Sequence, residues 1–472
     1  MNCINISKTN VFMAYGGYSY IDKNYIPKKT DFVTVLWVKG TVPFKTLAEA
    51  LAAESSVGTW TKLATMNDFV WKKLRAHVFK TVKVSQNSGY VYIAYPYDHF
   101  DSGNLLQILA SIRGNIYGMK ELSELKFLDW VIPEKFQRQF PGPKIGIKEI
   151  RKIVGTKKRP HVGTIVKPKV GLSAKDWASV AEKAFMGGLD MVKDDENLVD
   201  QKFCPWEERV LKTIEIAEKA KDEFGEGKIY VSNITDFMPK MLERIDFLED
   251  HGWKQCMIDV YVIGIAGTQQ ILSELHKRKF LVHAHRAGHG AETRGPWGIG
   301  FVFWEKIYRL LGVSQLHTGT GVGKMEGSLL EIMKYGEIAK EGKVKALEPF
   351  FLKFKWHKKI KPMMPVASGG LHPGLIEGVK EIYQKDFTAM AGGGVHGHPR
   401  GTLSGAKAHR ATAEAIAEGK TLKTKSKEVP ELGEALKKWG YLSGEKTKKD
   451  IENALKRFKN KAFKSGWNLE KV

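Results

Sequence analysis

The chain has 472 residues, and 75 Lys and Arg against 52 Asp and Glu give a formal net charge of +23. Hydrophobic residues make up 43% and charged residues 27%, which excludes an intrinsically disordered chain and suits two to four folded domains. No apolar run approaches the roughly 18 residues of a membrane span, and the first residues lack the basic-then-apolar pattern of a secretory signal. The positive charge predicts an anionic partner, either phosphorylated metabolites or nucleic acid.

The cysteines point to the compartment. Cys3, Cys204 and Cys256 are odd in number and widely spaced, and no CxxC pair occurs. A disulfide framework or a zinc site is therefore not expected, and the reducing cytoplasm is the expected location.

Residues 1–140 mix β-rich and helical patterns. Residues 32–38 and 88–95 read as strands because they are rich in β-branched and aromatic side chains, and residues 46–53 read as a helix. We expect a small N-terminal α+β domain.

Residues 141–420 alternate short apolar runs with longer helical patterns. Eight such runs occur, at 163–166, 189–192, 229–231, 257–262, 280–283, 315–317, 364–367 and 387–390. Eight strand–helix units in this length predict a (β/α)₈ barrel, whose active site lies at the carboxyl ends of the strands. An open doubly wound sheet is the alternative, but it does not normally place functional residues after all of its strands.

Residues 421–472 form a Lys-rich tail. Ile451, Leu455 and Phe458 are spaced for one face of a helix. We expect this helix to dock on the barrel or on a partner subunit. A nucleic-acid-binding arm is the alternative, and no nucleic-acid-binding motif supports it.

The segment 187–197 runs from a strand into Lys-Asp-Asp-Glu-Asn. Because strand side chains alternate, Lys193 and Asp195 point the same way, and Glu196 follows where the chain can turn inward. Two carboxylates at a barrel mouth can hold Mg²⁺. A lysine that has reacted with CO₂ is an anionic carbamate and supplies a third oxygen ligand. The alternative is a Lys–Asp ion pair at a helix start.

A second segment ends in Lys167-Pro168-Lys169. Lys167 and Lys169 are expected on one face, where like charges lower the pKa of each amine and suit it to proton transfer. A basic pair that faces a phosphate is the alternative.

Two further segments carry polar groups. His283 and His285 share a strand face before Arg286, and they read either as a metal pair or as a grip on substrate hydroxyl and phosphate groups. Three glycines in residues 319–323 precede Lys324, a pattern typical of a lid that closes a lysine over substrate and excludes water.

Glycines follow the seventh and eighth predicted strands. Ser368, Gly369 and Gly370 follow one, and the triplet from Gly392 follows the other. Barrels frequently bind phosphate after these two strands, through backbone N–H groups.

These blocks together resemble the large subunit of ribulose-1,5-bisphosphate carboxylase/oxygenase (Rubisco). The matching blocks run in family order from AAESSVGTW at 52–60 to the glycine triplet, and GLDMVKDDEN, HAHRAGH, GVGKMEG and ASGGLHPG are specific as a set. The segment AGGGVHGHP resembles the archaeal form III or bridging II/III type.

The resemblance implies roles for individual residues. Lys193 would be carbamylated and would hold one Mg²⁺ with Asp195 and Glu196, and its carbamate would take the first proton from the substrate. Lys167 would carry later protons, and Lys324 would close over the intermediate. The remaining implied site residues line the substrate or bind its phosphates: Glu54, Thr59, Trp60, Asn115, Lys169, His285, Arg286, His317, Ser368, Gly369, Gly370, Gly392 and Gly393.

The resemblance also implies partners. The substrates would be ribulose 1,5-bisphosphate, CO₂ and O₂, and the unit a homodimer or larger homo-oligomer whose sites are shared through Glu54–Trp60 and Asn115. No small subunit, nucleic acid or membrane is expected, and a form III type implies nucleotide (AMP) salvage. Ile165 and Met390-Ala391 depart from plant-type members at positions that bear on CO₂/O₂ selectivity. A non-carboxylating Rubisco-like enolase or isomerase is the alternative enzyme.

Overall fold

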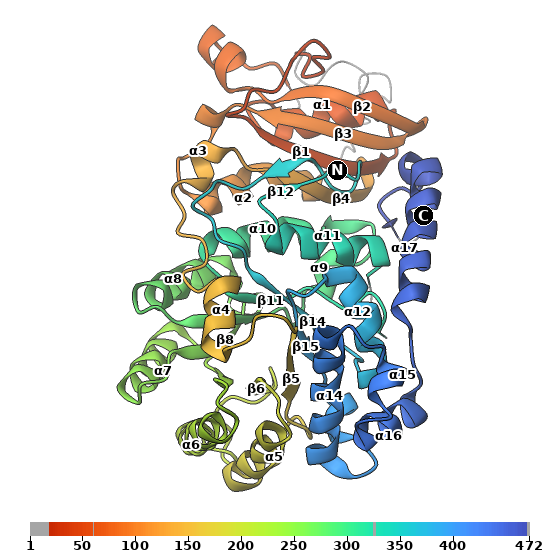
Figure 1. The fold of residues 1–472 in the computed structure, drawn as a ribbon. Coiled ribbons are helices and arrows are strands. Elements are labelled where there is room, and N and C mark those ends of the chain that lie inside the picture. Colours follow the sequence, from red (N-terminus) through yellow and green to blue (C-terminus); the bar gives the residue numbers. More distant parts are fainter. Residues whose placement is uncertain (1–17, 60, 324–326, 470–472) are drawn as a thin grey trace, which may run out of the picture.

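The computed structural model describes residues 18–59, 61–323 and 327–469. An N-terminal sheet domain packs on one side of a barrel, and the C-terminal helices run alongside both (Figure 1). Among the described helices, none is both long and apolar enough to cross a bilayer.

The N-terminal domain is built on a five-stranded sheet in the order β10-β4-β1-β3-β2. Its strands are β1 (Phe32–Gly40), β2 (His77–Ser85), β3 (Ser88–Tyr95), β4 (Leu122–Val131) and β10 (Trp297–Ile299). Its helices and short turns are α1 (Phe44–Glu54), η2 (Val70–Leu74), η3 (Tyr97–His99), α2 (Leu105–Arg113), η4 (Asn115–Gly118) and α3 (Glu134–Gln137). The strands predicted at 32–38 and 88–95 and the helix predicted at 46–53 are confirmed.

One strand of this sheet comes from the barrel part of the chain. β10 pairs in parallel with β4 between Trp297 and Leu125. Behind the sheet, the fully buried Lys306 ammonium lies 2.6 Å from Asp129 Oδ1. These contacts join the two bodies through both backbone and side chains.

The barrel is closed and parallel, in the order β11-β14-β15-β5-β6-β7-β8-β9. Its strands are β5 (His161–Ile165), β6 (Met191–Lys193), β7 (Ile229–Asn233), β8 (Gln255–Asp259), β9 (Leu281–His285), β11 (Gln315–His317), β14 (Met364–Ser368) and β15 (Thr388–Met390). Each of the eight predicted runs overlaps one of these strands, so the barrel is confirmed and the open sheet is wrong.

Helices and a small hairpin surround the strands. They are α4 (Ile147–Val154), α5 (Ala174–Met186), α6 (Trp206–Phe224), α7 (Met238–Asp250), α8 (Gly264–Lys277), α9 (Gly290–Thr293), α10 (Phe301–Leu311), α11 (Leu329–Lys340), β12 (Lys343–Val344), β13 (Phe354–Lys355), η5 (Pro373–Leu375), α12 (Ile376–Tyr383), α13 (Gly393–His396) and α14 (Gly401–Glu418).

A separate apolar core fills the amino-terminal end of the barrel. Ile150 and Val154 of α4 pack there with inward-facing strand residues, four of which are the methionines 191, 257, 364 and 390. Unbranched, flexible methionine side chains fill irregular space well. Because apolar side chains fill this end, we expect the functional polar side chains at the opposite, carboxyl end of the barrel.

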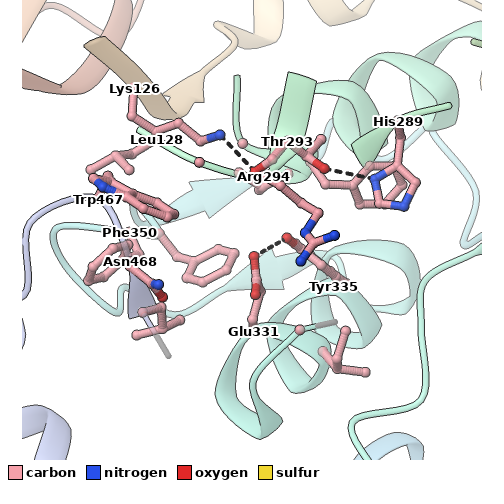
Figure 2. A pocket seen from close by; sticks show the side chains of 18 of the residues that line it. Lys126, Leu128, His289, Thr293, Arg294, Glu331, Tyr335, Phe350, Trp467 and Asn468 are labelled. Atoms are coloured by element: carbon pink, nitrogen blue, oxygen red, sulfur yellow. Dashed lines mark hydrogen bonds between the residues drawn. The ribbon is translucent and has the colours of Figure 1, made fainter. Parts of the chain in front are cut away.

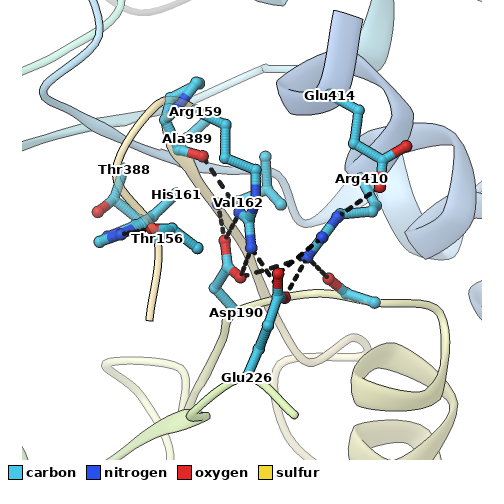
Figure 3. Close-up of polar contacts among 12 residues, drawn as sticks. Thr156, Arg159, His161, Val162, Asp190, Glu226, Thr388, Ala389, Arg410 and Glu414 are labelled. Carbon is cyan, nitrogen blue, oxygen red and sulfur yellow. Dashed lines mark hydrogen bonds and ion pairs between the residues drawn. The ribbon is translucent and has the colours of Figure 1, made fainter. Parts of the chain in front are cut away.

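A buried ion network also stabilises the amino-terminal end (Figure 3). Asp190, fully buried, accepts hydrogen bonds from Arg159 at 2.5 and 2.6 Å and from the Val162 amide at 2.9 Å. Glu226 accepts from Arg159 at 3.0 Å and from Arg410 at 2.7 and 3.0 Å. Burial alone would raise the pKa of Asp190, but the Arg159 hydrogen bonds lower it to about 2.

The tail (residues 421–472) folds into α15 (Leu422–Lys425), α16 (Pro430–Trp439), α17 (Gly444–Lys461) and η6 (Ala462–Lys464). Phe458 of α17 is buried, with its ring 6.2 Å from that of Phe350. Beyond α17, the Tyr90 hydroxyl of the N-terminal sheet donates to the Gly466 carbonyl at 2.9 Å. The tail helix therefore docks along its predicted apolar face and reaches both bodies (Figure 1).

Candidate active site

Lys193 ends strand β6 at the carboxyl end of the barrel and is fully buried. Its amine donates to the Asp194 carbonyl at 2.6 Å and lies 3.6 Å from Glu196 Oε2. Burial lowers the pKa of this amine below its ordinary value, although nearby carboxylates, Glu196 first among them, oppose the change. A buried lysine with a lowered pKa gives up its proton more readily, and the neutral amine is the form that reacts as a nucleophile.

The two carboxylates that follow face the same space. Asp195 Oδ2 accepts from Lys167 Nζ at 2.6 Å, and Oδ1 accepts from the Asn197 side chain at 2.8 Å. Glu196 Oε2 lies 3.6 Å from His285 Nε2. Burial would raise both carboxyl pKa values, but Lys167 and Asn197 lower that of Asp195, and His285 and Lys193 lower that of Glu196. Lys193, Asp195 and Glu196 therefore meet as predicted.

Asp194, the first residue after β6, points away from the site. Its carboxylate pairs with Arg209 at 3.0 Å and accepts from the Tyr230 hydroxyl at 3.0 Å and the Asn233 amide at 2.9 Å. Both Asp194 and Arg209 are fully buried. Asp194 thus anchors the strand end, and its neighbours face the site.

The histidines of β9 and β11 lie side by side. β9 pairs with β11 in the register Gln315 to His283, which places His283 Nε2 2.8 Å from His317 Nε2. His283 Nδ1 contacts Gln315 Oε1 at 3.0 Å, and His285 Nδ1 contacts Asp259 Oδ1 at 2.8 Å. Burial lowers the pKa of His283 to about 3 and that of His317 well below its ordinary value, so both rings are neutral.

These contacts bear on the metal interpretation of the His283–His285 pair. His283 engages Gln315 and His317, and in the described part of the chain no group of three or more His, Cys, Asp or Glu is arranged to hold a metal ion. Both ring nitrogens of His283 are therefore engaged, and the predicted grip on substrate rests on His285, whose Nε2 lies 3.6 Å from Glu196 Oε2.

The two predicted lysines after β5 separate. The strand ends at Ile165, so its alternation does not extend to Lys169, which is exposed. Lys167 is half-buried and donates to Asp195. Lys167 therefore pairs with a carboxylate, and the prediction that Lys167 and Lys169 lie side by side is wrong.

Arg286 and the predicted lid glycines are in contact. The Arg286 guanidinium stacks on the Phe301 ring at 4.1 Å. Gly319 has φ +95°, and a Cβ there would come within 3.3 Å of an Arg286 guanidinium nitrogen. The first residue of the predicted lid loop therefore packs against the Arg286 side chain. Lys324 itself lies outside the described residues.

The glycines predicted to bind phosphate lie on the neighbouring strand ends. Ser368 is the last residue of β14, and Gly369 and Gly370 turn the chain away with positive φ angles. A Cβ on Gly392 would meet Lys167 Cε at 2.9 Å, whereas a Cβ on Gly393 would meet no atom within 4 Å. These turns therefore border Lys167 and leave open space at Gly393.

Glu54, Thr59 and Asn115 belong to the N-terminal domain. Asn115 Nδ2 donates to Glu54 Oε1 at 3.1 Å. Within the described residues, no hydrogen bond or ion pair joins Glu54 or Asn115 to the barrel site of the same chain. Trp60 lies outside the described residues.

A cavity of about 250 Å³ lies between Arg286 and the tail (Figure 2). Lys126 of β4 borders it and donates to the Thr293 carbonyl at 2.7 Å. Tyr335 and Glu331 of α11 line another wall, and Trp467 and Asn468 bring the tail to its edge. The tail thus reaches the neighbourhood of the predicted phosphate-binding arginine.

Sequence reasoning missed several supporting residues. Asp259 holds His285, Gln315 holds His283, and His396 bonds to the end of β5. Gln315 could have been identified from the sequence, because it lies two residues before His317 and therefore on the same face of the strand. Asp259 is visible in the sequence only as a polar residue inside the predicted run 257–262, and in the structure it ends β8.

Comparisons with known proteins match both the N-terminal domain and the barrel. Residues 146–439 match the family described as "Ribulose bisphosphate carboxylase large chain, catalytic domain", and residues 19–136 match the corresponding N-terminal domain. The ribulose bisphosphate carboxylase of Methanocaldococcus jannaschii is 46% identical over 426 residues, which cover 89% of this chain and 99% of that protein.

Solved structures give the same result. The dimeric archaeal Rubisco from Hyperthermus butylicus superposes with a TM-score of 0.83 at 37% identity, covering 90% of this chain and 99% of that one. Octameric Rubisco from Pyrococcus horikoshii superposes with a TM-score of 0.81 at 37% identity, covering 89% and 96%.

Proposed function

The chain belongs to the ribulose bisphosphate carboxylase large-chain family, a family of carboxy-lyases, and we propose that it carboxylates ribulose 1,5-bisphosphate to 3-phosphoglycerate, with O₂ as the competing substrate. One observation carries the proposal. The buried amine of Lys193 lies beside the Glu196 carboxylate, and Lys167 and His285 contact Asp195 and Glu196 at the carboxyl end of the barrel.

The donor set fits Mg²⁺ bound through a lysine carbamate. Asp195 and Glu196 supply two carboxylates, and an ammonium at Lys193 would repel a cation placed between them. Carbamylation of Lys193 converts that positive charge into an anion with a further oxygen ligand. Lys193, Asp195 and Glu196 would then hold the ion, which supplies Lewis-acid polarisation of substrate oxygens when bound.

Two side chains suit proton transfer. The carbamylated Lys193 would accept the first proton from the substrate carbon, because its buried position excludes competing water. Lys167 would deliver later protons from Nζ, which Asp195 Oδ2 holds 2.6 Å away. His285, fixed on Asp259, would contact a substrate hydroxyl.

Separate groups would hold the two phosphates. A sugar bisphosphate carries roughly −4 at neutral pH. Arg286, His317 and Ser368 would bind one phosphate, and the backbone amides of Gly370, Gly392 and Gly393 would bind the other. Gly369 directly precedes Gly370, and Lys169 would add positive charge that offsets the bisphosphate. Lys324 would close over the reacting carbon and exclude water.

We also propose a homodimer with shared sites as the minimum unit, without a small subunit. Glu54 and Asn115 bond to each other, and within the described residues no bond joins them to the barrel site of their own chain. This supports the proposal that they would serve a second copy together with Thr59 and Trp60. Related proteins include dimeric and octameric archaeal Rubisco. By its resemblance to form III members, we place the reaction in nucleotide (AMP) salvage.

The test is incorporation of labelled CO₂ into 3-phosphoglycerate after preincubation with CO₂ and Mg²⁺. Wild type and the exposed control Lys202→Ala should fix CO₂, and Lys193→Ala should not. Exchange of the substrate C3 proton without fixed CO₂ would instead identify a non-carboxylating enolase or isomerase. Equal fixation by wild type and Lys193→Ala would reject the proposed centre.

A further inference from the structure

His396 lies between the end of β5 and the start of α14. Its Nε2 is 3.0 Å from the Ile165 carbonyl and 2.9 Å from Thr164 Oγ1. Its Nδ1 is 3.0 Å from Thr402 Oγ1. Both ring nitrogens therefore have partners on different elements of the barrel.

These partners fix the tautomer of His396. A carbonyl only accepts, so Nε2 carries the proton and donates to Ile165, and Nδ1 accepts from the Thr402 hydroxyl. Thr164 Oγ1 in turn donates to the Ala391 carbonyl at 2.8 Å. Burial lowers the pKa of His396 to about 4, so the ring is neutral at pH 7.

The bonds connect two functional segments. Ile165 ends β5, and Lys167 follows two residues later. His396 ends α13, the helix that begins at Gly393. Gly392 packs on the side chain of Lys167, since a Cβ there would lie 2.9 Å from Lys167 Cε. His396 therefore ties the segment that carries Lys167 to the glycine segment beside it.

We infer that His396 is a positioning residue: its hydrogen bonds to Ile165 and Thr164 hold the Lys167 amine on Asp195, in register with the Gly392 and Gly393 backbone. Its effect on turnover rests on the proposed function, whereas its effect on the placement of Lys167 does not. Misplacement of a reacting group by about 1 Å can reduce a rate by roughly a hundredfold.

His398 offers a matched control. It lies two residues later, its side chain is fully buried, and its Nε2 contacts the Glu431 carbonyl at 2.9 Å. That carbonyl belongs to α16 of the tail, far along the chain from β5. Loss of this histidine removes its hydrogen bonds to the Glu431 carbonyl and the Arg400 amide and leaves the His396 bonds to β5 intact.

The experiment compares His396→Leu, His396→Gln and His398→Gln. For His396→Leu we expect kcat for carboxylation to fall at least about tenfold, with KM for the bisphosphate changed less than about threefold. His396→Gln keeps an N–H donor for Ile165 and should recover most of kcat. His398→Gln should lower the melting temperature and keep kcat.

A second measurement does not need turnover. Competitive labelling with an amine-reactive anhydride, read by peptide mass spectrometry, gives the reactivity of Lys167 relative to exposed Lys202. It should rise severalfold in His396→Leu and stay at the wild-type value in His398→Gln. If the leucine variant does not fold, Thr402→Val removes the Nδ1 partner and should raise Lys167 labelling to a smaller extent.

The outcomes separate the two claims. A wild-type chain without carboxylation refutes the proposed function, and raised Lys167 labelling in His396→Leu would still support the positioning role. The positioning role of His396 would be overturned if His396→Leu kept both the wild-type kcat and the wild-type labelling of Lys167. It would also be overturned if His398→Gln lowered kcat as much as His396→Leu does.

Discussion

Asp190→Asn tests the ion network at the amino-terminal end of the barrel. The substitution keeps the shape of Asp190 but removes the charge that Arg159 contacts at 2.5 and 2.6 Å (Figure 3). Removing one partner of a buried ion pair costs about 3–5 kcal/mol, because the remaining charge is left buried and uncompensated. We expect the free energy of unfolding at pH 7 to fall by about that amount.

The pKa of Asp190 gives a second value for the stability that its ionised carboxylate contributes. A pKa of about 2 in the folded state, against an ordinary 3.8, corresponds to about 2.5 kcal/mol of stability at neutral pH. The folded pKa is the lower one, so this stability is present above pH 3.8 and is lost as pH falls toward 2. At pH 3 about half of it should remain.

Urea unfolding of wild type and variant at pH 7 and pH 3 measures both effects. Glu414→Gln is the control, because Glu414 pairs with Arg410 in the same network but its side chain is 37% exposed. That pair should contribute less than about 1 kcal/mol. A loss below about 1 kcal/mol for Asp190→Asn, or a loss that does not shrink at pH 3, would show that the Asp190–Arg159 ion pair does not stabilise the fold as described.

Three further predictions concern other parts of the molecule. Glu305 is fully buried, neither of its carboxylate oxygens has a hydrogen-bond partner among the described residues, and burial raises its pKa well above the ordinary value. Glu305→Gln should therefore increase the free energy of unfolding at pH 7. In urea unfolding this gain should vanish below about pH 4.5. Phe458→Ala should cost about 3 kcal/mol and speed proteolysis of the tail, whereas exposed Lys459→Ala should leave the proteolysis rate unchanged. Chelation of Mg²⁺ should abolish carboxylation reversibly without changing the circular dichroism spectrum; lasting activity, or loss of the spectrum, would contradict this.

The barrel could be predicted because its signals are local. Each strand is a short apolar run, and the polar residues that follow, such as Lys193, Arg286 and Ser368, mark the carboxyl end. Strand alternation also predicted that Lys193 and Asp195 face one way, and the Asp194–Arg209 pair on the other face agrees.

Other features depend on partners far apart in the sequence. β10 joins the N-terminal sheet although about 170 residues separate it from β4, and no local pattern specifies that pairing. Lys167 and Lys169 were expected together from spacing alone, but β5 ends before both and Lys167 turns to Asp195. Likewise, the role of His396 depends on Ile165, 231 residues earlier, which only the closed barrel brings near.

The most direct test of the Lys193 centre is ¹³C NMR of the protein with ¹³C-labelled CO₂ and Mg²⁺. We predict a carbamate resonance that strengthens with Mg²⁺ and is absent in Lys193→Arg. A carbamate signal that persists in Lys193→Arg, or full carboxylation by wild type without any carbamate signal, would contradict it.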